Sequence, residues 1–328
     1  MSKILITGAS GFVGSFLIEE ALNEGLETYA GIRATSNKKW LQDDRIHFLE
    51  LDLTTTNHLK EVIEYHQFDY IIHNAGVTKS NKKSEYFTVN VDYSKNLAEA
   101  SLVSRKLKKF SFISSLAAFG PADYQKEKVL SNHSIPHPVT TYGHSKLKAE
   151  RVLKELKSLP LIIFRPTGIF GPRESDFLNV FETINRGFAP SVGFEEQWIS
   201  LIYVKDLVNI ILKATISDIK NKAYFVTDGN LYPSAKFNRA IAESLGKNPF
   251  HFKVPLPLVY VIAGISEGLS RISGNASILN MDKFQEIKAR NLDCDISNLV
   301  QDFDFKPKYD LQAAINETTE WYKENKWL

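Results

Sequence analysis

The sequence predicts a doubly wound α/β fold with a smaller, mostly helical C-terminal cap, and two observations carry that prediction. Short apolar runs alternate with helical segments through the first half of the 328-residue chain, which is typical of strands buried on both faces of a parallel sheet. A glycine-rich turn follows the first apolar run, where such folds bind a dinucleotide at the carboxyl ends of their strands. The expected architecture is therefore a Rossmann-type sheet.

The predicted elements of the first half follow one another in order. Apolar, β-rich runs predict strands at residues 3–7, 26–33, 46–51, 68–76 with its loop, 109–114 and 159–165. Amphipathic runs predict helices at 12–25, 56–66, about 84–107, and from 140 onward. Gly25 closes the first of these helices, because glycine readily adopts the left-handed conformation at a helix end.

The second half is less regular. Its pattern predicts strands at 201–204 and 223–227 around a helix at 205–217, and further helices near 234–245, 257–272, 281–290 and 310–325. We assign residues 1–170 to a dinucleotide-binding domain, to which 201–228 return. Residues 171–200 and 229–328 are assigned to a substrate-binding cap and C-terminal helix.

Composition and charge argue against several classes of protein. The formal net charge is +2 with a pI near 8.3, which is too balanced for a nucleic-acid binder. Cys294 is the single cysteine, so no intrachain disulfide can form and a cytoplasmic location is expected. The longest apolar stretch, 254–265, is too short to span a membrane. The N-terminus does not look like a signal peptide, and we expect no metal site.

The turn after the first strand, "ITGASGFVG", carries three glycines at the spacing of a dinucleotide-binding loop. Gly8 would permit the tight turn, Gly11 would let a pyrophosphate approach the backbone, and Gly14 would let helix and strand pack closely. The phosphates would then meet the free N–H groups of the helix. A tight turn without a ligand is the alternative. The remaining predicted contacts in this loop are Ser10, Phe12 and Val13.

Cofactor choice should be encoded near the end of the second strand, where an acidic residue would bind the ribose 2′-hydroxyl of NAD. No Asp or Glu lies between Glu27 and Asp43, whereas Arg33 stands at the strand end and Lys38 follows it. A guanidinium can bind a 2′-phosphate with two hydrogen bonds. The sequence therefore favours NADP, with NAD and an exposed arginine that binds no ligand as the alternative.

Tyr142 and Lys146 lie one helical turn apart, so their side chains share a face of the predicted helix. They could be a surface pair or a proton-transfer pair. Beside a nicotinamide cofactor, a phenol acidified by the ammonium and by the positive nicotinamide ring could exchange a proton with a carbonyl or alcohol. Ser114 or Ser115, at the end of the preceding predicted strand, could orient that carbonyl.

Six motifs follow one another along the chain: "TGASGFVG", "IIHNAG", "SSLAAFG", "YGHSK", "RPTGIFGPR" and "LIYVKDL". In these motifs and their order the chain resembles the extended short-chain dehydrogenases/reductases, the NAD-dependent epimerase/dehydratase superfamily. That superfamily holds sugar-nucleotide epimerases, dihydroflavonol reductases and 3β-hydroxysteroid dehydrogenases. The resemblance covers nearly the whole chain and implies an NAD(P)-dependent enzyme with a small-molecule substrate. We also expect a homodimer.

The resemblance implies a role for each matching residue. Ser115 matches the hydroxyl that polarises the carbonyl, Tyr142 the acid/base, and Lys146 the group that binds the nicotinamide ribose, which makes the last two cofactor contacts as well. Further contacts are implied on the adenine side, at the wall of the cofactor cleft, at a bracing asparagine and beneath the nicotinamide: Asp52 with Leu53, Ala75 with Gly76, Asn90, and Arg165 with Pro166. Asp206 matches a structural aspartate at a helix start, and we expect His73 only to pack.

Two departures from the pattern bear on the substrate. Phe119 stands where sugar-nucleotide members usually carry a tyrosine, and Trp198, Ile199 and Ser200 occupy the region of their usual cation. The C-terminal half resembles that of steroid- and flavonoid-type reductases, and the apolar helix at 257–272 could line a hydrophobic pocket or merely pack the cap. The predicted substrate contacts are Thr78, Ser115 and Phe119.

Three interpretations of function remain open at this point. The leading one is an NADP-dependent reductase or dehydrogenase that acts on a carbonyl or secondary alcohol of a fairly apolar molecule. The second is a sugar-nucleotide epimerase or dehydratase with tightly bound NAD. The third is a non-catalytic dinucleotide sensor, against which the set of Ser115, Tyr142 and Lys146 argues, because a sensor has no need of an acidified phenol.

Overall fold

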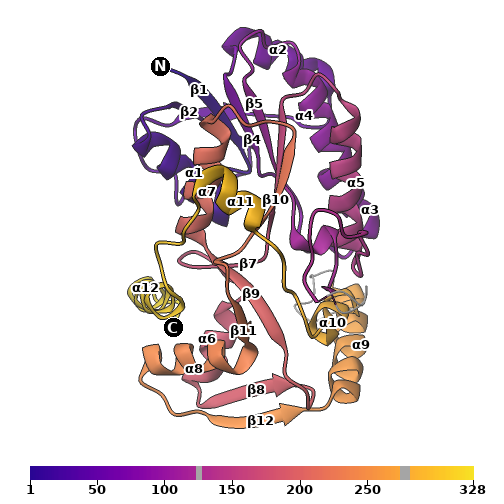
Figure 1. The fold of residues 1–328 in the computed structure, drawn as a ribbon, viewed down its shortest axis with the longest axis vertical. Helices are drawn as coiled ribbons and strands as arrows, with labels where there is room; N and C mark the ends of the chain where they lie inside the picture. Colours follow the sequence, from indigo (N-terminus) through magenta and orange to yellow (C-terminus); the bar gives the residue numbers. More distant parts are fainter. Residues whose placement is uncertain (123–127, 274–280) are drawn as a thin grey trace.

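A parallel sheet of seven strands forms the upper part of the molecule (Figure 1). The computed structural model describes residues 1–122, 128–273 and 281–328. In the order β10-β6-β5-β4-β1-β2-β3, the strands are Lys222–Val226, Leu161–Pro166, Lys109–Ile113, Tyr70–His73, Lys3–Thr7, Glu27–Ile32 and His47–Glu50. The strand order reverses direction between β1 and β4, and doubly wound sheets bind their ligands at the carboxyl edge of such a switch point. The predicted fold class is confirmed.

Helices cover both faces of this sheet. α1 (Phe12–Asn23), α7 (Val204–Ile216) and α11 (Ser297–Phe303) lie on one face, and α2 (Thr56–His66), α4 (Tyr93–Ser101) and α5 (Thr141–Glu155) on the other (Figure 1). Alternate side chains of β1 enter the two cores, since Ile4 and Ile6 pack with α1 and α7 while Leu5 packs against the opposite layer. The central strands are therefore buried on both faces, as their apolar runs predicted, whereas the edge strand β3 is largely exposed.

The helix predicted at 84–107 is three pieces in the structure. α3 (Lys83–Phe87) runs into a π-helical turn over Thr88–Asp92, and α4 follows and ends at Ser101. A π-turn inserts an extra residue into a helix and is frequent at functional sites. Here it contains the buried Asn90.

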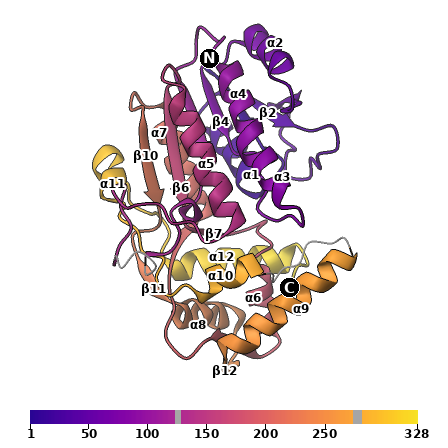
Figure 2. The same ribbon diagram turned by 90° about the vertical axis from the view of Figure 1, so that its right-hand side faces the viewer.

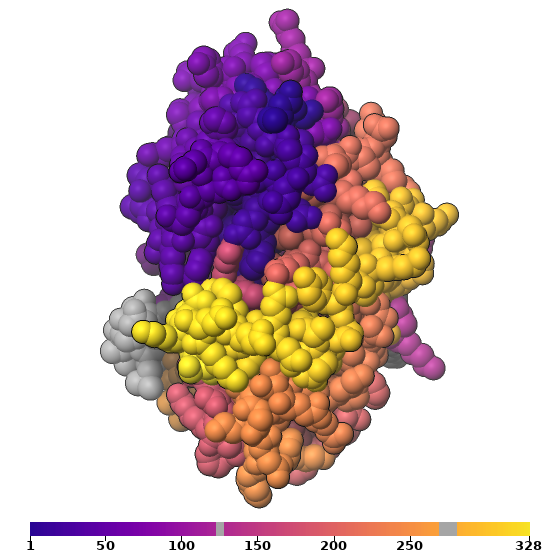
Figure 3. All heavy atoms as spheres, turned by 90° about the vertical axis from the view of Figure 1, so that its left-hand side faces the viewer, coloured from indigo at the N-terminus to yellow at the C-terminus, as the bar shows by residue number. Residues whose placement is uncertain are grey.

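The cap forms the lower part of the molecule. It contains a sheet of β7 (Gly168–Phe170), β9 (Trp198–Tyr203) and β11 (Leu231–Pro233), and a pair of β8 (Phe188–Val192) with β12 (Phe250–Val254). Its helices are α6 (Leu178–Asn185), α8 (Ser234–Leu245), α9 (Leu256–Ser273), α10 (Met281–Lys288) and α12 (Leu311–Glu324). The C-terminal residues cross the molecule between its N-terminal part and the cap (Figure 3). The strand predicted at 201–204 thus joins the cap sheet rather than the large one.

α9 is apolar over most of its length, but few of its described side chains are buried. Among its described side chains Val259 and Ala263 are buried, whereas Leu258, Val261, Ile262 and Ile265 are between 44% and 60% exposed. The helix therefore packs through a narrow stripe and leaves most of its apolar surface open. Within the three described ranges, no helix is both long and apolar enough to cross a bilayer.

Candidate active site

The glycine loop joins β1 to α1 at the carboxyl edge of the sheet. Gly8 has a positive φ of 67° and its carbonyl accepts the Gly11 N–H at 3.1 Å, so the chain turns here in a conformation that favours glycine. A Cβ atom on Gly14 would lie 2.0 Å from the Gly8 oxygen, which leaves no room for any side chain. The first turn of α1 holds no acidic residue, so its free N–H groups can receive a phosphate. Ser10, Phe12 and Val13 are partly exposed in this loop.

The residues predicted on the adenine side lie at the ends of β2 and β3. Arg33 is exposed just after β2, and its backbone N–H donates to Ser36 Oγ at 3.0 Å. Among the described residues, its guanidinium has no hydrogen bond or ion pair within the chain. Lys38 Nζ lies 4.2 Å from the centroid of the Phe48 ring. Asp52 is exposed beyond β3, next to the partly buried Leu53, and its carboxylate accepts the Thr54 N–H at 2.9 Å.

The three predicted catalytic residues are brought together by β5 and α5. α5 is capped by Thr140, whose Oγ1 accepts the Gly143 N–H at 3.0 Å. The start of this helix places Tyr142 one turn before Lys146, whose Nζ lies 6.0 Å from the tyrosine ring centroid and donates to the Ile113 carbonyl at 2.8 Å. Ser115 follows β5, and its hydroxyl lies close enough to the Tyr142 phenol to lower the pKa of that group.

The two titratable side chains respond differently to burial. Burial raises the pKa of Tyr142 above its usual range, the hydrogen bond from Ser115 opposes that rise, and the carboxylate of Glu286 adds to it. Burial lowers the pKa of Lys146 to about 8, with Glu150 acting in the opposite direction. The chain alone therefore keeps the phenol protonated, because burial outweighs the lowering effect of Ser115. The expected acidification of Tyr142 is not produced by its protein neighbours.

The loop after β4 forms the wall beside Lys146. Asn90 Oδ1 accepts the Val77 N–H at 2.8 Å, and Asn90 Nδ2 donates to the Val77 carbonyl at 3.0 Å. A Cβ atom on Gly76 would lie 3.0 Å from Asn90 Oδ1 and 3.3 Å from Lys146 Nζ, so this glycine lets the loop approach the lysine. Ala75 is partly exposed and Thr78 is exposed along the same loop.

The side chain of Arg165, a residue predicted to lie beneath the nicotinamide, is engaged within the protein. Its Nε and Nη2 donate to the two carboxylate oxygens of Glu150 at 2.9 and 2.6 Å, and its Nη1 donates to Asn132 Oδ1 at 2.7 Å. Ser114 Oγ also donates to Glu150, at 2.6 Å. The guanidinium is thus a buried structural group beneath α5, and only the backbone of Arg165 and Pro166 remains for the predicted role.

Phe119 is likewise not a substrate contact in this structure. Its side chain is 4% exposed and packs edge-on against Phe225, with ring centroids 5.1 Å apart. The Arg165 guanidinium also packs against this ring, with its central carbon 4.2 Å from the ring centroid.

Asp206 was predicted as a charge at the start of a helix, and it lies in the first turn of α7. Its carboxylate accepts the backbone N–H groups of Lys308 and Tyr309 at 2.9 and 3.3 Å. It therefore also anchors the C-terminal segment.

Several residues of α10, α3 and the loop after β4 escaped the sequence analysis. Asp282 of α10 accepts the Thr141 N–H at 2.8 Å, so the cap touches the start of α5 directly (Figure 2). The Tyr86 ring lies 6.5 Å from the Tyr142 ring, and Lys79 forms an ion pair with Asp176. These residues are far apart in sequence and carry no local motif, so no pattern identified them.

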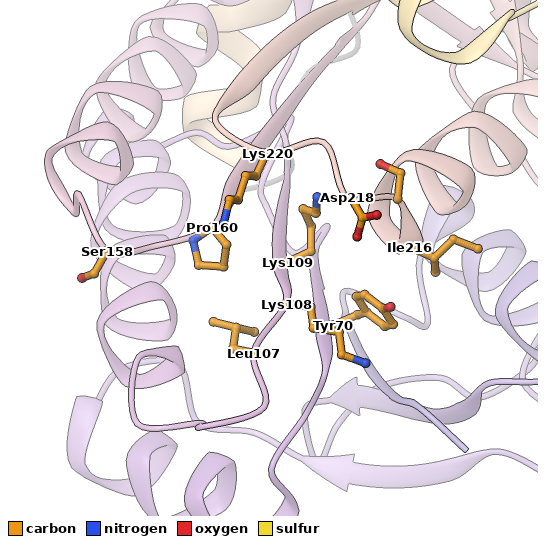
Figure 4. Close-up of a pocket in the computed structure, with 10 residues that line it drawn as sticks. Tyr70, Leu107, Lys108, Lys109, Ser158, Pro160, Ile216, Asp218 and Lys220 are labelled. Atoms are coloured by element: carbon orange, nitrogen blue, oxygen red, sulfur yellow. The ribbon is translucent and has the colours of Figure 1, made fainter.

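A separate pocket of 380 Å³ lies at the opposite edge of the sheet (Figure 4). It is lined by residues before β4, β5 and β6 and after α7, among them Lys108, Lys109, Asp218 and Lys220. Tyr142 and the glycine loop lie at the carboxyl ends of the strands, whereas this pocket lies at their amino ends. It is therefore distinct from the candidate active site.

Residues 4–226 match the NAD dependent epimerase/dehydratase family, and the chain belongs to that family. It is accordingly an NAD(P)-dependent enzyme of the extended short-chain dehydrogenase/reductase type. The ceramide reductase of Caulobacter vibrioides is 23% identical to it, with 99% of this chain and 96% of the reductase aligned.

Other relatives carry different activities in their names. The UDP-glucose 4-epimerase of Vibrio cholerae is 26% identical, over 97% of this chain and 94% of the epimerase. A sterol-4-alpha-carboxylate 3-dehydrogenase of Candida albicans is 24% identical, over 99% of both chains. The crystal structure of UDP-glucose 4-epimerase from Thermotoga maritima superposes with a TM-score of 0.79 at 20% identity, over 98% of this chain and 99% of the other. That likeness shows the shared fold, and the substrate differs among these relatives.

Proposed function

We propose that this family member is an NADP-dependent oxidoreductase that transfers a hydride between nicotinamide and a carbonyl or secondary alcohol of a fairly apolar molecule. The observation that carries the proposal is the grouping of Ser115, Tyr142 and Lys146 beside the loop after β4. The nicotinamide would supply or accept the hydride. The residues of the chain would orient the carbonyl, move the proton and hold the ribose.

Tyr142 can supply the proton that reduction of a carbonyl requires. A carbonyl that has gained a hydride needs a proton on its oxygen, and a phenol whose pKa is raised by burial holds one ready. Ser115, which lies close to that phenol, would donate to the same oxygen. Lys146 is buried with its Nζ between the phenol and the loop after β4, where it would bind the ribose.

The geometry at the end of β2 supports NADP as the cofactor. Arg33 is exposed at the carboxyl edge with a guanidinium that none of the described residues engages, so it is available for a 2′-phosphate. Glu27, the nearest preceding acid, is occupied by the Tyr29 hydroxyl at 2.6 Å. A carboxylate to bind the ribose 2′-hydroxyl of NAD is thus missing from the described end of this strand.

We expect Arg33→Ala to weaken NADP(H) binding by about 1–3 kcal/mol, the value of a charge-assisted hydrogen bond, and to leave NAD(H) binding unchanged. Dissociation constants for both cofactors would be measured by fluorescence titration of the parent and the variant. Arg45→Ala is the matched control, because Arg45 is exposed in the same segment and pairs with Asp43 at 2.6 Å. Equal affinities of the parent for the two cofactors would contradict the proposal.

The charges near Tyr142 argue against a nucleotide-sugar substrate. Glu286 lies close enough to raise the pKa of Tyr142, and Asp282 binds the start of α5. The nearby ammonium groups are already paired, since Lys79 meets Asp176 and Lys283 donates to Glu286 at 2.8 Å. A sugar diphosphate brings two further negative charges, which need cations or helix N-termini close by.

Most of the arginine charge of the cap is already paired; among its described arginine side chains, the exposed Arg239 of α8 is the one without a carboxylate partner. Three of them pair with carboxylates: Arg173 with Glu19, Arg186 with Glu182, and Arg290 with Glu195. The side chain of Arg271 lies outside the described residues. The exposed apolar side chains of α9, next to α10, instead suit an apolar substrate. Two of the relatives reported above are named for a ceramide and a sterol carboxylate, which agrees with this choice.

We expect neither UDP nor GDP to bind the NADP-loaded protein at millimolar concentration. Loading with NADP fills the dinucleotide site, so any heat of binding in a calorimetric titration reports on the cap. The alternative is a sugar-nucleotide epimerase, the activity for which the Vibrio cholerae relative is named. An epimerase must bind one of these nucleotides, so micromolar binding of either would favour that alternative over our proposal.

The activity itself is tested by following NADPH consumption with a panel of ketones, aldehydes and nucleotide sugars. Consumption with an apolar ketone or aldehyde is the expected result. Conversion of a nucleotide sugar without net NADPH consumption would identify an epimerase or dehydratase. A chain that binds the cofactor and converts none of these classes would fit the sensor alternative.

A further inference from the structure

His73 ends β4 and lies fully buried between two hydroxyl groups. Its Nδ1 lies 2.7 Å from Thr7 Oγ1, and its Nε2 lies 2.9 Å from Ser94 Oγ. Thr7 is the last residue of β1, directly before the glycine loop, and Ser94 is in the first turn of α4. The imidazole therefore connects the strand that carries the glycine loop to the helix that follows the π-helical turn.

The direction of each hydrogen bond in this chain of contacts follows from the number of protons available. Ser94 Oγ donates its single proton to the Asn90 carbonyl at 2.7 Å, so on its other side it accepts a proton from His73 Nε2. In a neutral ring Nδ1 is then an acceptor, and Thr7 Oγ1 donates to it. Thr7 Oγ1 accepts in turn from the Ala75 N–H at 3.3 Å. The result is a one-way chain from the Ala75 N–H to the Asn90 carbonyl.

The surroundings of His73 keep the ring neutral. Burial lowers its pKa to about 3, and the positive charge of Lys146 acts in the same direction. Phe112 contacts both groups, since its ring stacks on the imidazole with centroids 5.9 Å apart and has Lys146 Nζ 5.0 Å from its centroid. A second ring proton would also point an N–H at the Thr7 hydroxyl proton. The neutral Nε2–H tautomer is therefore the form of His73 in which the ring nitrogens and the Thr7 and Ser94 hydroxyls all have hydrogen-bond partners.

The chain of hydrogen bonds continues beyond Asn90 into α5, the helix that carries Tyr142. Asn90 Nδ2 donates to Ser145 Oγ at 2.9 Å, and Ser145 Oγ donates to the Tyr142 carbonyl at 2.7 Å. The same amide holds both backbone groups of Val77. One network of buried groups thus joins the glycine loop, the loop after β4 and the backbone of Tyr142.

We propose that His73 is a positioning residue, which as a neutral Nε2–H imidazole holds the wall of the cofactor cleft in register with the glycine loop and with Tyr142. The inference rests on the proposed placement of the cofactor in that cleft. It predicts that breaking the chain at either end loosens Ala75 and Val77 and weakens cofactor binding. Direct contact between His73 and the cofactor is not required, because the ring acts through Thr7 and Ser94.

The test uses Thr7→Val and Ser94→Ala, which cut the chain on opposite sides of the ring. Each should raise the dissociation constant for NADPH by about fivefold, the value of one hydrogen bond. In a His73→Phe background, which keeps a stacked ring but no polar atoms, the same two substitutions should have a smaller effect, because only the bonds of the two hydroxyls to Ala75 and Asn90 remain to be lost. Ser111→Ala is the matched control, because it removes a buried hydroxyl of the neighbouring β5 that bonds Thr215 at 2.7 Å and lies outside the network.

Nitrogen NMR of histidine-labelled protein reports the tautomer of His73 and its response to NADPH. A side chain that only stabilises the fold would not respond to the cofactor. We expect His73 in the Nε2–H form from pH 5 to 8 with no titration, as its pKa of about 3 requires, and a shifted Nε2–H resonance on addition of NADPH. A protonated ring or an Nδ1–H tautomer would overturn the inference. So would NADPH affinities in Thr7→Val and Ser94→Ala equal to that of Ser111→Ala. A parent chain that binds no NADPH would refute the proposed function instead.

Discussion

Replacing Tyr142 with phenylalanine is expected to lower turnover at least about a hundredfold, the low end for general acid catalysis, and to leave the cofactor affinity unchanged. The substitution removes the hydroxyl that lies near Ser115 and the proton that Tyr142 would donate. The ring and its burial remain, so the fold should be preserved. Steady-state rates with a converted carbonyl compound, together with an NADPH titration, measure the two effects separately.

Tyr86→Phe is the control for this experiment. Its ring lies 6.5 Å from that of Tyr142, and its hydroxyl accepts the Ser80 N–H at 3.0 Å rather than facing Ser115. Turnover in this variant should fall by less than about tenfold, the value of a single hydrogen bond. If Tyr142→Phe retains a rate similar to that of the control, the proton comes from another group.

Removing the carboxylate of Glu150 is expected to lower the free energy of unfolding by about 3–5 kcal/mol, because it leaves the buried Arg165 guanidinium unpaired. Burial alone would raise the pKa of Glu150, but hydrogen bonds from Arg165 and Ser114 outweigh it and the pKa falls below its usual value of 4.5. The ionised pair therefore stabilises the fold at neutral pH, and this stability is lost as the pH falls below about 4.5. Denaturant unfolding of Glu150→Ala measures the loss.

Two further variants separate the buried pair from ion pairs in general. Asp43→Ala breaks the exposed pair with Arg45 and should cost less than about 1 kcal/mol. The double substitution Glu150→Leu with Arg165→Met removes both charges and should recover most of the stability, since apolar replacements of buried pairs are often neutral. A double variant as unstable as Glu150→Ala would show that packing, rather than the unpaired charge, causes the loss.

The strands and the glycine loop could be predicted because their signals are local. Apolar runs indicate burial on both faces of a strand. Gly14 must be glycine because its α-carbon packs against the Gly8 carbonyl, only six residues earlier in the sequence. The same holds for Thr140, whose capping role depends on a residue three positions away. Sequence alone thus identified the sheet, the turn and the start of α5.

What the sequence could not show depends on contacts between distant residues. Arg165 looks like a ligand-binding arginine until Glu150, on the neighbouring helix, takes up its guanidinium. Phe119 looks like a substrate contact until the fold places Phe225 against it. His73 carries a chain of hydrogen bonds because Thr7 and Ser94, 66 and 21 residues away in sequence, meet at its two nitrogens. In each case the partner, and not the residue itself, determines the role.

The order in which the strands occur along the chain has a consequence for how the protein is made. β10, an edge strand of the large sheet, and α11, which packs beside it, follow the cap strands β7, β8 and β9 in the sequence. A ribosome therefore releases the first six strands while one face of their sheet still lacks α7 and α11. The apolar side chains of that face, such as Ile162 and Phe164, are buried with residues of α7 and α11 in the complete core. The large sheet therefore cannot complete its core before residue 303 has left the ribosome, by which point every cap element except α12 has been synthesised.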